Sequence, residues 1–222
     1  MARVKFLGHA AFEVELDGKH LLFDPWIRGN RLACLEVEDL RGIDLILVTH
    51  AHSDHLGQAF EIARRNDARI VAVHEIAVEA EKEGLRSVGV NVGGPARVEG
   101  FEIVATPALH SSPLGTPIGF IVRGREATIY HAGDTGLFSD IALYGQLYPV
   151  DVAMIPIGGH YTMNCEQAAI FTTLLKPKVV IPMHYNTFPL IRADPSVFAR
   201  EVAKRTRDVR VVILRPCEDF EF

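Results

Sequence analysis

Short apolar runs alternate with polar turns along the whole chain, a pattern typical of strands and helices in close succession. Near the start, two strand-like stretches flank the hairpin signal Asp17-Gly18. The aliphatic run 45–48 is short and has no polar position, which predicts a strand buried on both faces. By the same criteria we expect strands at residues 3–7, 11–16, 20–24, 45–48, 70–73, 98–106, 118–123, 126–131, 151–157, 178–183 and 209–214.

Apolar residues at helical spacing mark a second set of elements. Leu56, Ala59 and Ala63 follow this spacing after the buried run, and Gly84 and Pro177 are typical stop signals for two later helices. We expect helices at residues 56–66, 75–83, 139–147, 165–175 and 196–206. The region 27–43 has no clean periodicity, and we expect it to form a loop over a functional site.

Four potential metal ligands follow the run 45–48 within six positions: His50, His52, Asp54 and His55. His50 and His52 are two residues apart, so on extended backbone both side chains project to one side and can reach one ion. The chain then turns, which lets Asp54 and His55 face a second ion about 3.5–4 Å away, a spacing at which two ions share one hydroxide. The competing interpretation is a polar turn with coincidental histidines.

The segment from His50 to His55 resembles the His-x-His-x-Asp-His signature of the metallo-β-lactamase superfamily. This resemblance implies an α/β fold, an αββα sandwich of two mixed sheets with helices on the outer faces and the metals at one edge. It implies three further ligands, each at the end of a predicted strand. They are His110, the bridging carboxylate Asp134 in a Gly-Asp-Thr segment, and His184. For His110 and Asp134 the alternatives are an ordinary loop histidine and an ordinary Asp-containing turn.

In this arrangement His110 joins His50 and His52 on the first ion, and His184 joins Asp54 and His55 on the second. The resemblance therefore implies two divalent ions. Imidazole and carboxylate ligands suit Zn²⁺ best, although Mn²⁺ and Fe²⁺ fit the same donors. We expect a metal-bridged hydroxide to be the nucleophile, with the catalytic groups Asp54 and His9.

Near the start, Gly8-His9-Ala10 resembles a branch of largely uncharacterised metal-dependent hydrolases similar to ascorbate-phosphate lactonase and N-acyl-phosphatidylethanolamine phospholipase D. The resemblance makes His9 a substrate contact or proton donor, against a hydrogen-bonded structural histidine. It likewise makes His160, Tyr161 and Thr162 substrate contacts, against a plain loop in which Asn164 caps a helix. Two further groups, Asp24 and His131, follow predicted strands. Asp24 either braces the metal loops or caps a turn, and His131 either supports the ligands or is a partly exposed strand-end histidine.

The 222 residues suffice for a single domain, 1–222, with one substantial core. The formal net charge of −5 argues against a nucleic-acid partner, and no apolar run is long enough to anchor the chain in a membrane. Three distant cysteines, Cys34, Cys165 and Cys217, imply no disulfide framework, so we expect a cytoplasmic protein. We expect Cys165 to be a packed residue, and the sequence leaves self-association open.

The function that these features predict is metal-dependent hydrolysis of a small-molecule ester, lactone or phosphodiester. No cysteine stands in a ligand position, and no helical or inserted domain accompanies the motifs, so we expect neither antibiotic, thioester nor RNA hydrolysis. A non-catalytic metal-binding or scaffold protein on the same fold is the alternative. A redox di-iron protein ranks third, because such relatives carry Glu at the position of His52 and append a flavin domain.

Overall fold

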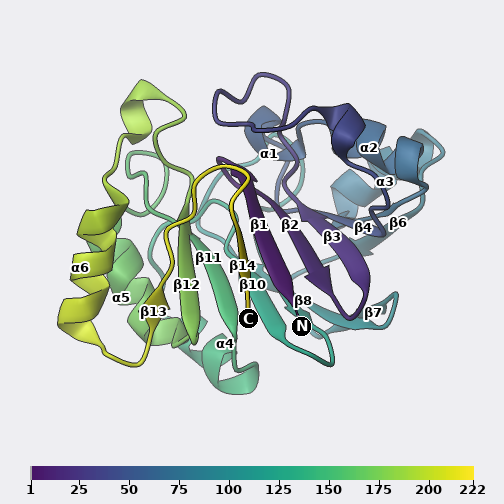
Figure 1. The fold of residues 1–222 in the computed structure, drawn as a ribbon. Helices are drawn as coiled ribbons and strands as arrows, with labels where there is room; N and C mark the ends of the chain where they lie inside the picture. The colour runs from purple at the N-terminus through teal and green to yellow at the C-terminus, as the bar shows by residue number, and fades with distance from the viewer. Residues whose placement is uncertain (1) are drawn as a thin grey trace.

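A computed structural model describes residues 2–222 as two seven-stranded sheets that pack face to face, with helices on the outer faces (Figure 1). This confirms the predicted αββα sandwich. The strand order is β14-β1-β2-β3-β4-β5-β6 in the first sheet and β13-β12-β11-β10-β9-β8-β7 in the second. Both sheets are mixed, because each combines antiparallel hairpins with parallel strands that follow helices.

The first sheet contains the N-terminal hairpins and the strand that precedes the histidine motif. Its strands are β1 (Arg3–Gly8), β2 (Ala11–Leu16), β3 (Lys19–Phe23), β4 (Leu45–Val48), β5 (Arg69–Val73), β6 (Ser87–Val90) and β14 (Asp219–Glu221). The helices in this part of the chain are η1 (Val37–Asp39), α1 (Ser53–Leu56), α2 (Ala59–Asn66) and α3 (His74–Lys82).

The second sheet repeats the plan, with antiparallel strands first and parallel strands afterwards. Its strands are β7 (Ala96–Val98), β8 (Phe101–Pro107), β9 (Ile118–Arg123), β10 (Thr128–His131), β11 (Val152–Pro156), β12 (Val179–Met183) and β13 (Arg210–Val211). The accompanying helices are α4 (Ile141–Leu147), α5 (Cys165–Leu175), η2 (Pro189–Ile191) and α6 (Pro195–Arg205). Asn164 caps α5 through a reciprocal capping box with Gln167, as the alternative interpretation of this loop had it.

The core lies between the sheets and beneath the helices. All four residues of β4 are fully buried, as expected for an aliphatic strand with neighbours on both faces. Phe12 and Phe23 of the first sheet and Phe120 and Tyr130 of the second are also fully buried. Each such side chain stabilises the fold by roughly 1.5–3 kcal/mol, and so the strand ends are held on a rigid base.

Two predicted elements are each divided in two. Of the expected helix 56–66, residues 59–66 form α2, while Leu56 is the last residue of α1. Gly57 separates the two helices, because it has φ of +44° and lies where a Cβ would be 2.5 Å from the Pro25 carbonyl. The expected strand 98–106 is a hairpin, β7–β8, whose turn residues Glu99 and Gly100 both have positive φ. Strands β6 and β14 were not predicted, and the expected strand 209–214 is reduced to β13.

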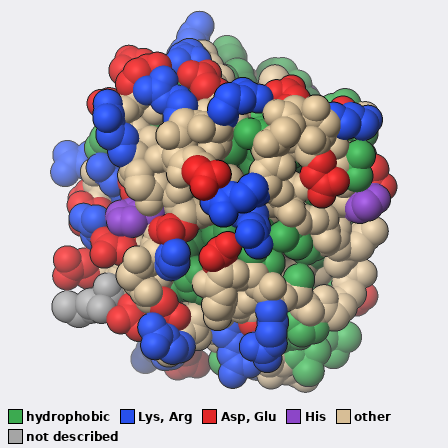
Figure 2. Space-filling view, turned by 90° about the vertical axis from the view of Figure 1, so that its right-hand side faces the viewer, with side chains coloured by type: hydrophobic (Ala, Val, Ile, Leu, Met, Phe, Trp, Pro, Cys, Tyr) green, Lys and Arg blue, Asp and Glu red, His purple; other side chains and the backbone are tan. Residues whose placement is uncertain are grey.

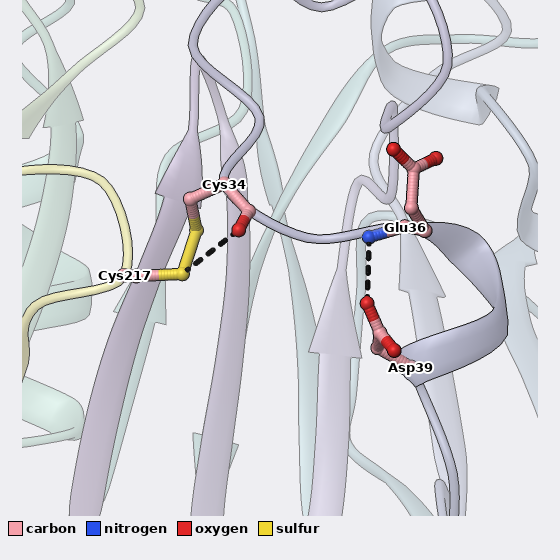
Figure 3. Close-up of a disulfide and its surroundings, with 4 residues drawn as sticks. All are labelled: Cys34, Glu36, Asp39 and Cys217. Atoms are coloured by element: carbon pink, nitrogen blue, oxygen red, sulfur yellow. Dashed lines mark hydrogen bonds between the residues drawn. A yellow bond between two sulfur atoms is a disulfide. The ribbon is translucent and has the colours of Figure 1, made fainter.

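The expectation that the cysteines form no disulfide is wrong. Cys34 and Cys217 are bonded, with Cα atoms 5.7 Å apart, although 183 residues separate them in sequence (Figure 3). The bond joins the loop after β3 to the segment that precedes β14. The prediction failed because β14 pairs with β1, which places these distant segments together. The expectation of a reducing compartment thereby loses the argument on which it rested. Cys165 is free and partly buried.

The surface over α2 and α3 mixes both signs of charge. Figure 2 shows basic and acidic side chains interspersed on the right-hand side of the molecule of Figure 1. Ion pairs such as Arg64–Glu83 and Arg65–Glu38 belong to this part of the chain. Within residues 2–222, the helices are all too short or too polar to cross a membrane.

Candidate metal centre

Four strands end at one edge of the sandwich, and each delivers a predicted ligand there. His50 lies two residues beyond β4, and His110 lies three residues beyond β8. Asp134 lies three residues beyond β10, and His184 directly follows β12. The short helix α1 adds Asp54 and His55, with His52 at its N-cap.

The structure brings all seven predicted ligands together. The ligand atoms of these seven residues, together with those of His9, form three groups, each with members within 4.8 Å of one another. The groups are His50, His52 and His110; then His50, His55 and Asp134; and then His9, Asp54, His55 and His184.

Asp134 lies at the centre of these groups. Its Oδ2 is 3.0 Å from His184 Nε2 and 3.5 Å from His110 Nε2, while its Oδ1 is 3.3 Å from His55 Nε2. Gly133 beside it has φ of +59°, and a Cβ there would meet Thr49 at 2.8 Å. The glycine therefore lets the backbone approach the first sheet closely, and the carboxylate faces histidines from both sheets.

The donor set fits divalent ions. Among the described residues, His55 Nε2, His184 Nδ1 and Asp134 Oδ1 are buried polar atoms without a hydrogen-bond partner. Such an atom costs about 1–3 kcal/mol unless a ligand satisfies it. Imidazole nitrogens and carboxylate oxygens suit Zn²⁺, Mn²⁺ and Fe²⁺. The unpaired atoms and the chemistry of the donors therefore both fit a metal centre.

The local electrostatics also favour metal binding. Burial and the neighbouring His55 lower the pKa of His50 to about 3. Burial alone would raise the pKa of Asp134, but His184 and His55 hold it well below its usual range. Neutral imidazole and ionised carboxylate are the forms that coordinate metals, so these two groups are prepared for binding. Burial alone would lower the pKa of His55, but Asp134 and Asp24 raise it well above its usual value, and a metal ion at this ring would have to displace its proton.

Asp24 braces the centre rather than capping a turn. It is fully buried, and its Oδ2 accepts hydrogen bonds from His55 Nδ1 at 2.7 Å and from Thr49 Oγ1 at 2.7 Å. Its Oδ1 accepts a 2.8 Å bond from the Thr49 backbone N–H. Because Nδ1 of His55 donates to Asp24, Nε2 of the same ring is left to face Asp134.

His131 also supports this edge. It is fully buried, its ring stacks on Phe23 at 5.2 Å, and its Nε2 donates to the Ala10 carbonyl at 2.9 Å. The Gly133 backbone N–H donates to Nδ1 at 3.1 Å. His131 therefore ties β10 of the second sheet to the β1–β2 turn of the first.

His9 is fully buried and lies next to Asp54. Its Nε2 is 3.2 Å from Asp54 Oδ2, and its Nδ1 is 2.8 Å from Thr187 Oγ1. Burial and the neighbouring His184 lower the pKa of His9 to about 4, so the ring is neutral near pH 7. With the proton on Nε2, His9 donates to the carboxylate and accepts from the Thr187 hydroxyl.

A cavity of about 310 Å³ opens beside the cluster. It is lined by His52, Asp54, His110, Ser111, Asp134, Tyr161, His184 and Phe188. Of the predicted substrate contacts, Tyr161 lines the cavity, whereas His9, His160 and Thr162 are not part of its wall. A larger hollow of about 580 Å³ lies between α5 and α6 and is lined by none of the predicted ligands.

Sequence reasoning missed Ser111, Thr187 and Phe188. Ser111 directly follows a predicted ligand, and the other two lie three and four residues after His184. Their position in the loops that follow ligand-bearing strands was the available signal, since functional side chains collect at such strand ends.

Comparison with known proteins agrees with this site. The chain matches the family described as "Beta-lactamase superfamily domain" over residues 19–185. It is 52% identical to a UPF0173 metal-dependent hydrolase of Thermofilum pendens, with all of both chains covered. It is 48% identical to a relative of the same description from Methanopyrus kandleri, with 99% of both chains covered.

Solved structures give the same result. Igni18, described as a novel metallo hydrolase from Ignicoccus hospitalis, superposes with a TM-score of 0.92 at 45% identity. The superposition covers 100% of this chain and 99% of Igni18. An isothiocyanate hydrolase from Delia radicum gut bacteria shares the fold, with a TM-score of 0.80 at 18% identity and 99% and 98% coverage. The chain therefore belongs to the metallo-β-lactamase superfamily and, within it, to the UPF0173 metal-dependent hydrolases.

Proposed function

We propose that this metal-dependent hydrolase is dinuclear and acts on a small ester, lactone or phosphodiester. The observation that carries the proposal is the convergence of seven ligand-type side chains beside an open cavity, with three of their atoms buried and unpaired. A purely structural cluster would satisfy these atoms within the protein.

Two sets of residues would hold the ions. His50, His52 and His110 would hold the first, and Asp54, His55 and His184 would hold the second, with Asp134 as a ligand shared by both. Two divalent ions about 3.5–4 Å apart lower the pKa of water and stabilise both the attacking and the leaving oxygen of a hydrolysed bond. Zn²⁺ is the proposed metal, and Mn²⁺ and Fe²⁺ accept the same donors.

The other residues orient these ligands and the substrate. Asp24 fixes the tautomer of His55. His9 positions Asp54 by a hydrogen bond from one ring nitrogen, and Thr187 orients the His9 ring by a hydrogen bond to the other ring nitrogen. Tyr161 and Ser111 place hydroxyl groups at the cavity wall, where they donate hydrogen bonds to substrate oxygens. Hydrolysis adds the oxygen of water to the acyl or phosphoryl centre, breaks the bond to the leaving oxygen, and delivers a proton to that oxygen.

Catalysis is favoured over a scaffold role because the open cavity reaches the ligands directly. Five of its eight lining residues are predicted metal ligands, namely His52, Asp54, His110, Asp134 and His184. A scaffold has no need to leave metal ligands open to small molecules.

The test combines metal analysis with a substrate panel. Protein purified without added metal is measured by mass spectrometry and assayed against a carboxylester, a lactone and a phosphodiester. We expect about two ions per chain and turnover of one class that a chelator abolishes. His110→Ala should lose metal and activity, whereas His20→Ala, which removes a partly exposed histidine of the first sheet, should retain both. No bound metal, and no turnover after zinc or manganese is added, would refute the proposal.

A further inference from the structure

Apart from the predicted metal ligands, the cavity is lined by Ser111, Tyr161 and Phe188, which are all uncharged and include two aromatic rings, and these side chains indicate what kind of substrate enters. We propose that the site takes a compact substrate whose part beyond the scissile group is uncharged and aromatic or short-chain aliphatic. This inference rests on the proposed function, since it concerns the same cavity. It names the substrate class by the chemistry of the group that does not react.

The size of the cavity limits the substrate. Its volume of about 310 Å³ lies at the lower end of the range for small-molecule sites, about 300–1,000 Å³. Such a space holds a hydrolysable group and one ring or short chain. A long acyl chain or an oligomeric substrate would extend into solvent, where the protein contributes no binding energy.

The charges around the cavity exclude a second anionic group. Among the described residues that line it, none is Lys or Arg, and the charged side chains are the predicted ligands Asp54 and Asp134. The two proposed ions are engaged by the scissile group, so a carboxylate or phosphate on the unreactive arm would lose water without gaining a Lys or Arg partner. Burying an unpaired charge in this way is costly.

Three exposed apolar side chains either line the cavity or lie close in sequence to residues that line it. The chain has eight large hydrophobic side chains that are exposed among its described residues. Tyr161, 52% exposed, lines the cavity, Leu109 at 57% adjoins the lining residue His110, and Leu190 at 58% lies two residues after Phe188. An apolar arm would cover surface of this kind, which is otherwise unfavourable in water.

Phe188 is held rigidly as the main apolar contact. Its ring stacks on Trp26 at 5.6 Å with an interplanar angle of 21°, and it meets the ring of His9 at 5.6 Å. Behind it, the Ile191 backbone N–H donates to the Phe188 carbonyl at 3.2 Å, and the Asn186 N–H donates to the Ile191 carbonyl at 2.9 Å. A side chain fixed in this way loses little entropy when a ligand binds, and it favours a flat partner.

The first experiment measures binding without turnover. Benzohydroxamate carries a metal-chelating group on a phenyl arm, and calorimetry with the zinc-loaded protein gives its Kd. Two matched probes carry a 4-carboxylate or the neutral 4-carboxamide on the same ring. We expect the carboxylate probe to bind at least about tenfold more weakly than the carboxamide probe, the equivalent of about 1.4 kcal/mol. Equal or tighter binding of the carboxylate probe would overturn the inference.

Variants then test whether the cavity residue Phe188 causes the preference for an uncharged ring substituent. Phe188→Ala should weaken binding of benzohydroxamate by about fivefold to tenfold, the loss expected for one aromatic contact. Phe188→Lys should reverse the preference in favour of the carboxylate probe. The control is Leu147→Ala, which removes an exposed apolar side chain of α4, outside the cavity, and should change neither affinity. Metal content and melting temperature verify that each variant is folded and loaded.

The same comparison made with substrates separates the two proposals. Phenyl esters or phenyl phosphodiesters with the same three ring substituents are assayed for kcat and KM, and the inference predicts that the carboxylate acts mainly on KM. If no substrate is turned over but the binding preference persists and depends on Phe188, the hydrolase proposal fails and the inference stands. If substrates are turned over with the carboxylate arm preferred, the inference fails and the hydrolase proposal stands.

Discussion

At each end of the sandwich a carboxylate joins the two sheets, but the two carboxylates differ in how fully their oxygens are hydrogen-bonded. At the metal end, Asp134 of the second sheet faces His55 of the first, and atoms of both remain unpaired. At the opposite end, Asp17 in the β2–β3 turn accepts the backbone N–H groups of Arg125 at 2.7 Å and Glu126 at 3.0 Å, in the β9–β10 turn (Figure 1). The carboxylate whose oxygens accept backbone hydrogen bonds is structural, whereas Asp134 Oδ1, which has only His55 Nε2 at 3.3 Å and no hydrogen bond, fits a metal ligand.

The largest expected effect comes from removing the charge at the metal end. Asp134→Asn should remove metal and lower kcat/KM by more than about a hundredfold, because loss of even an outer partner of a metal ligand costs about 10–100-fold. Metal content and steady-state kinetics measure this. Asp17→Asn, the matched change at the other end, should leave both unchanged. Retention of two ions by Asp134→Asn would remove the contrast between the ends.

Metal removal should lower the free energy of unfolding, because the ions stabilise the end of the sandwich that contains Asp134. An ion that binds only the folded chain adds about 4 kcal/mol when it is present at a thousand times its Kd. Urea unfolding with and without a chelator measures the difference, which should disappear in Asp134→Asn. If the chelator lowers the stability of that variant as much as that of the parent protein, the metal acts at some other place.

The disulfide provides a further comparison, since it joins the loop after β3 to the segment before β14 and involves none of the predicted metal ligands. The double variant Cys34→Ser and Cys217→Ser should lower the free energy of unfolding by about 2–4 kcal/mol and leave metal content unchanged. Cys165→Ser is the control, because that thiol is free. Thiol titration of the unfolded protein should find one thiol per chain before reduction and three afterwards. Three thiols before reduction would contradict the bond.

The smallest effect is expected at Asp17 and should depend on pH. Burial alone would raise the pKa of Asp17, but the N–H groups of Arg125 and Glu126 and the charge of Arg125 lower it below 3.8. A carboxyl whose pKa is lower in the folded state stabilises above its unfolded pKa, and this contribution is lost as the pH falls through the folded value. Metal-free Asp17→Asn should therefore be less stable by about 1 kcal/mol at pH 7. The difference from the metal-free parent should shrink below pH 3.8, and a difference independent of pH would exclude this explanation.

The parts of the molecule that the sequence predicts are those whose signal is local. The run 45–48 is aliphatic at every position, so its burial was evident, and the spacing of His50 and His52 on extended backbone already implied a shared ion. In contrast, β6 contains Gly89 and has three of its four residues incompletely buried, and β14 has only three residues. Edge strands of this kind carry no apolar run, because one side of them faces solvent.

Other features could not be predicted because they depend on contacts between distant segments. The bond between Cys34 and Cys217 requires the pairing of β14 with β1, and no spacing of cysteines encodes it. Phe188 likewise becomes part of the cavity through its stacking on Trp26, which lies far away in sequence. The division of the predicted helix 56–66 follows from the close approach of Gly57 to Pro25. Each of these facts exists only after the chain has folded.

The pairing of β14 with β1 also sets the order in which the protein can mature in the cell. Val4 lies opposite Phe220, so the outer edge of the first sheet stays open during synthesis until residues 219–221 have left the ribosome. Closing so long a loop is slow compared with local folding. The bond between Cys34 and Cys217 can form only after both thiols have been synthesised, and an external oxidant must accept the two electrons that the thiols lose. A nascent chain therefore exposes an unpaired strand edge for most of its synthesis, and chaperones that bind such edges have a long period in which to act.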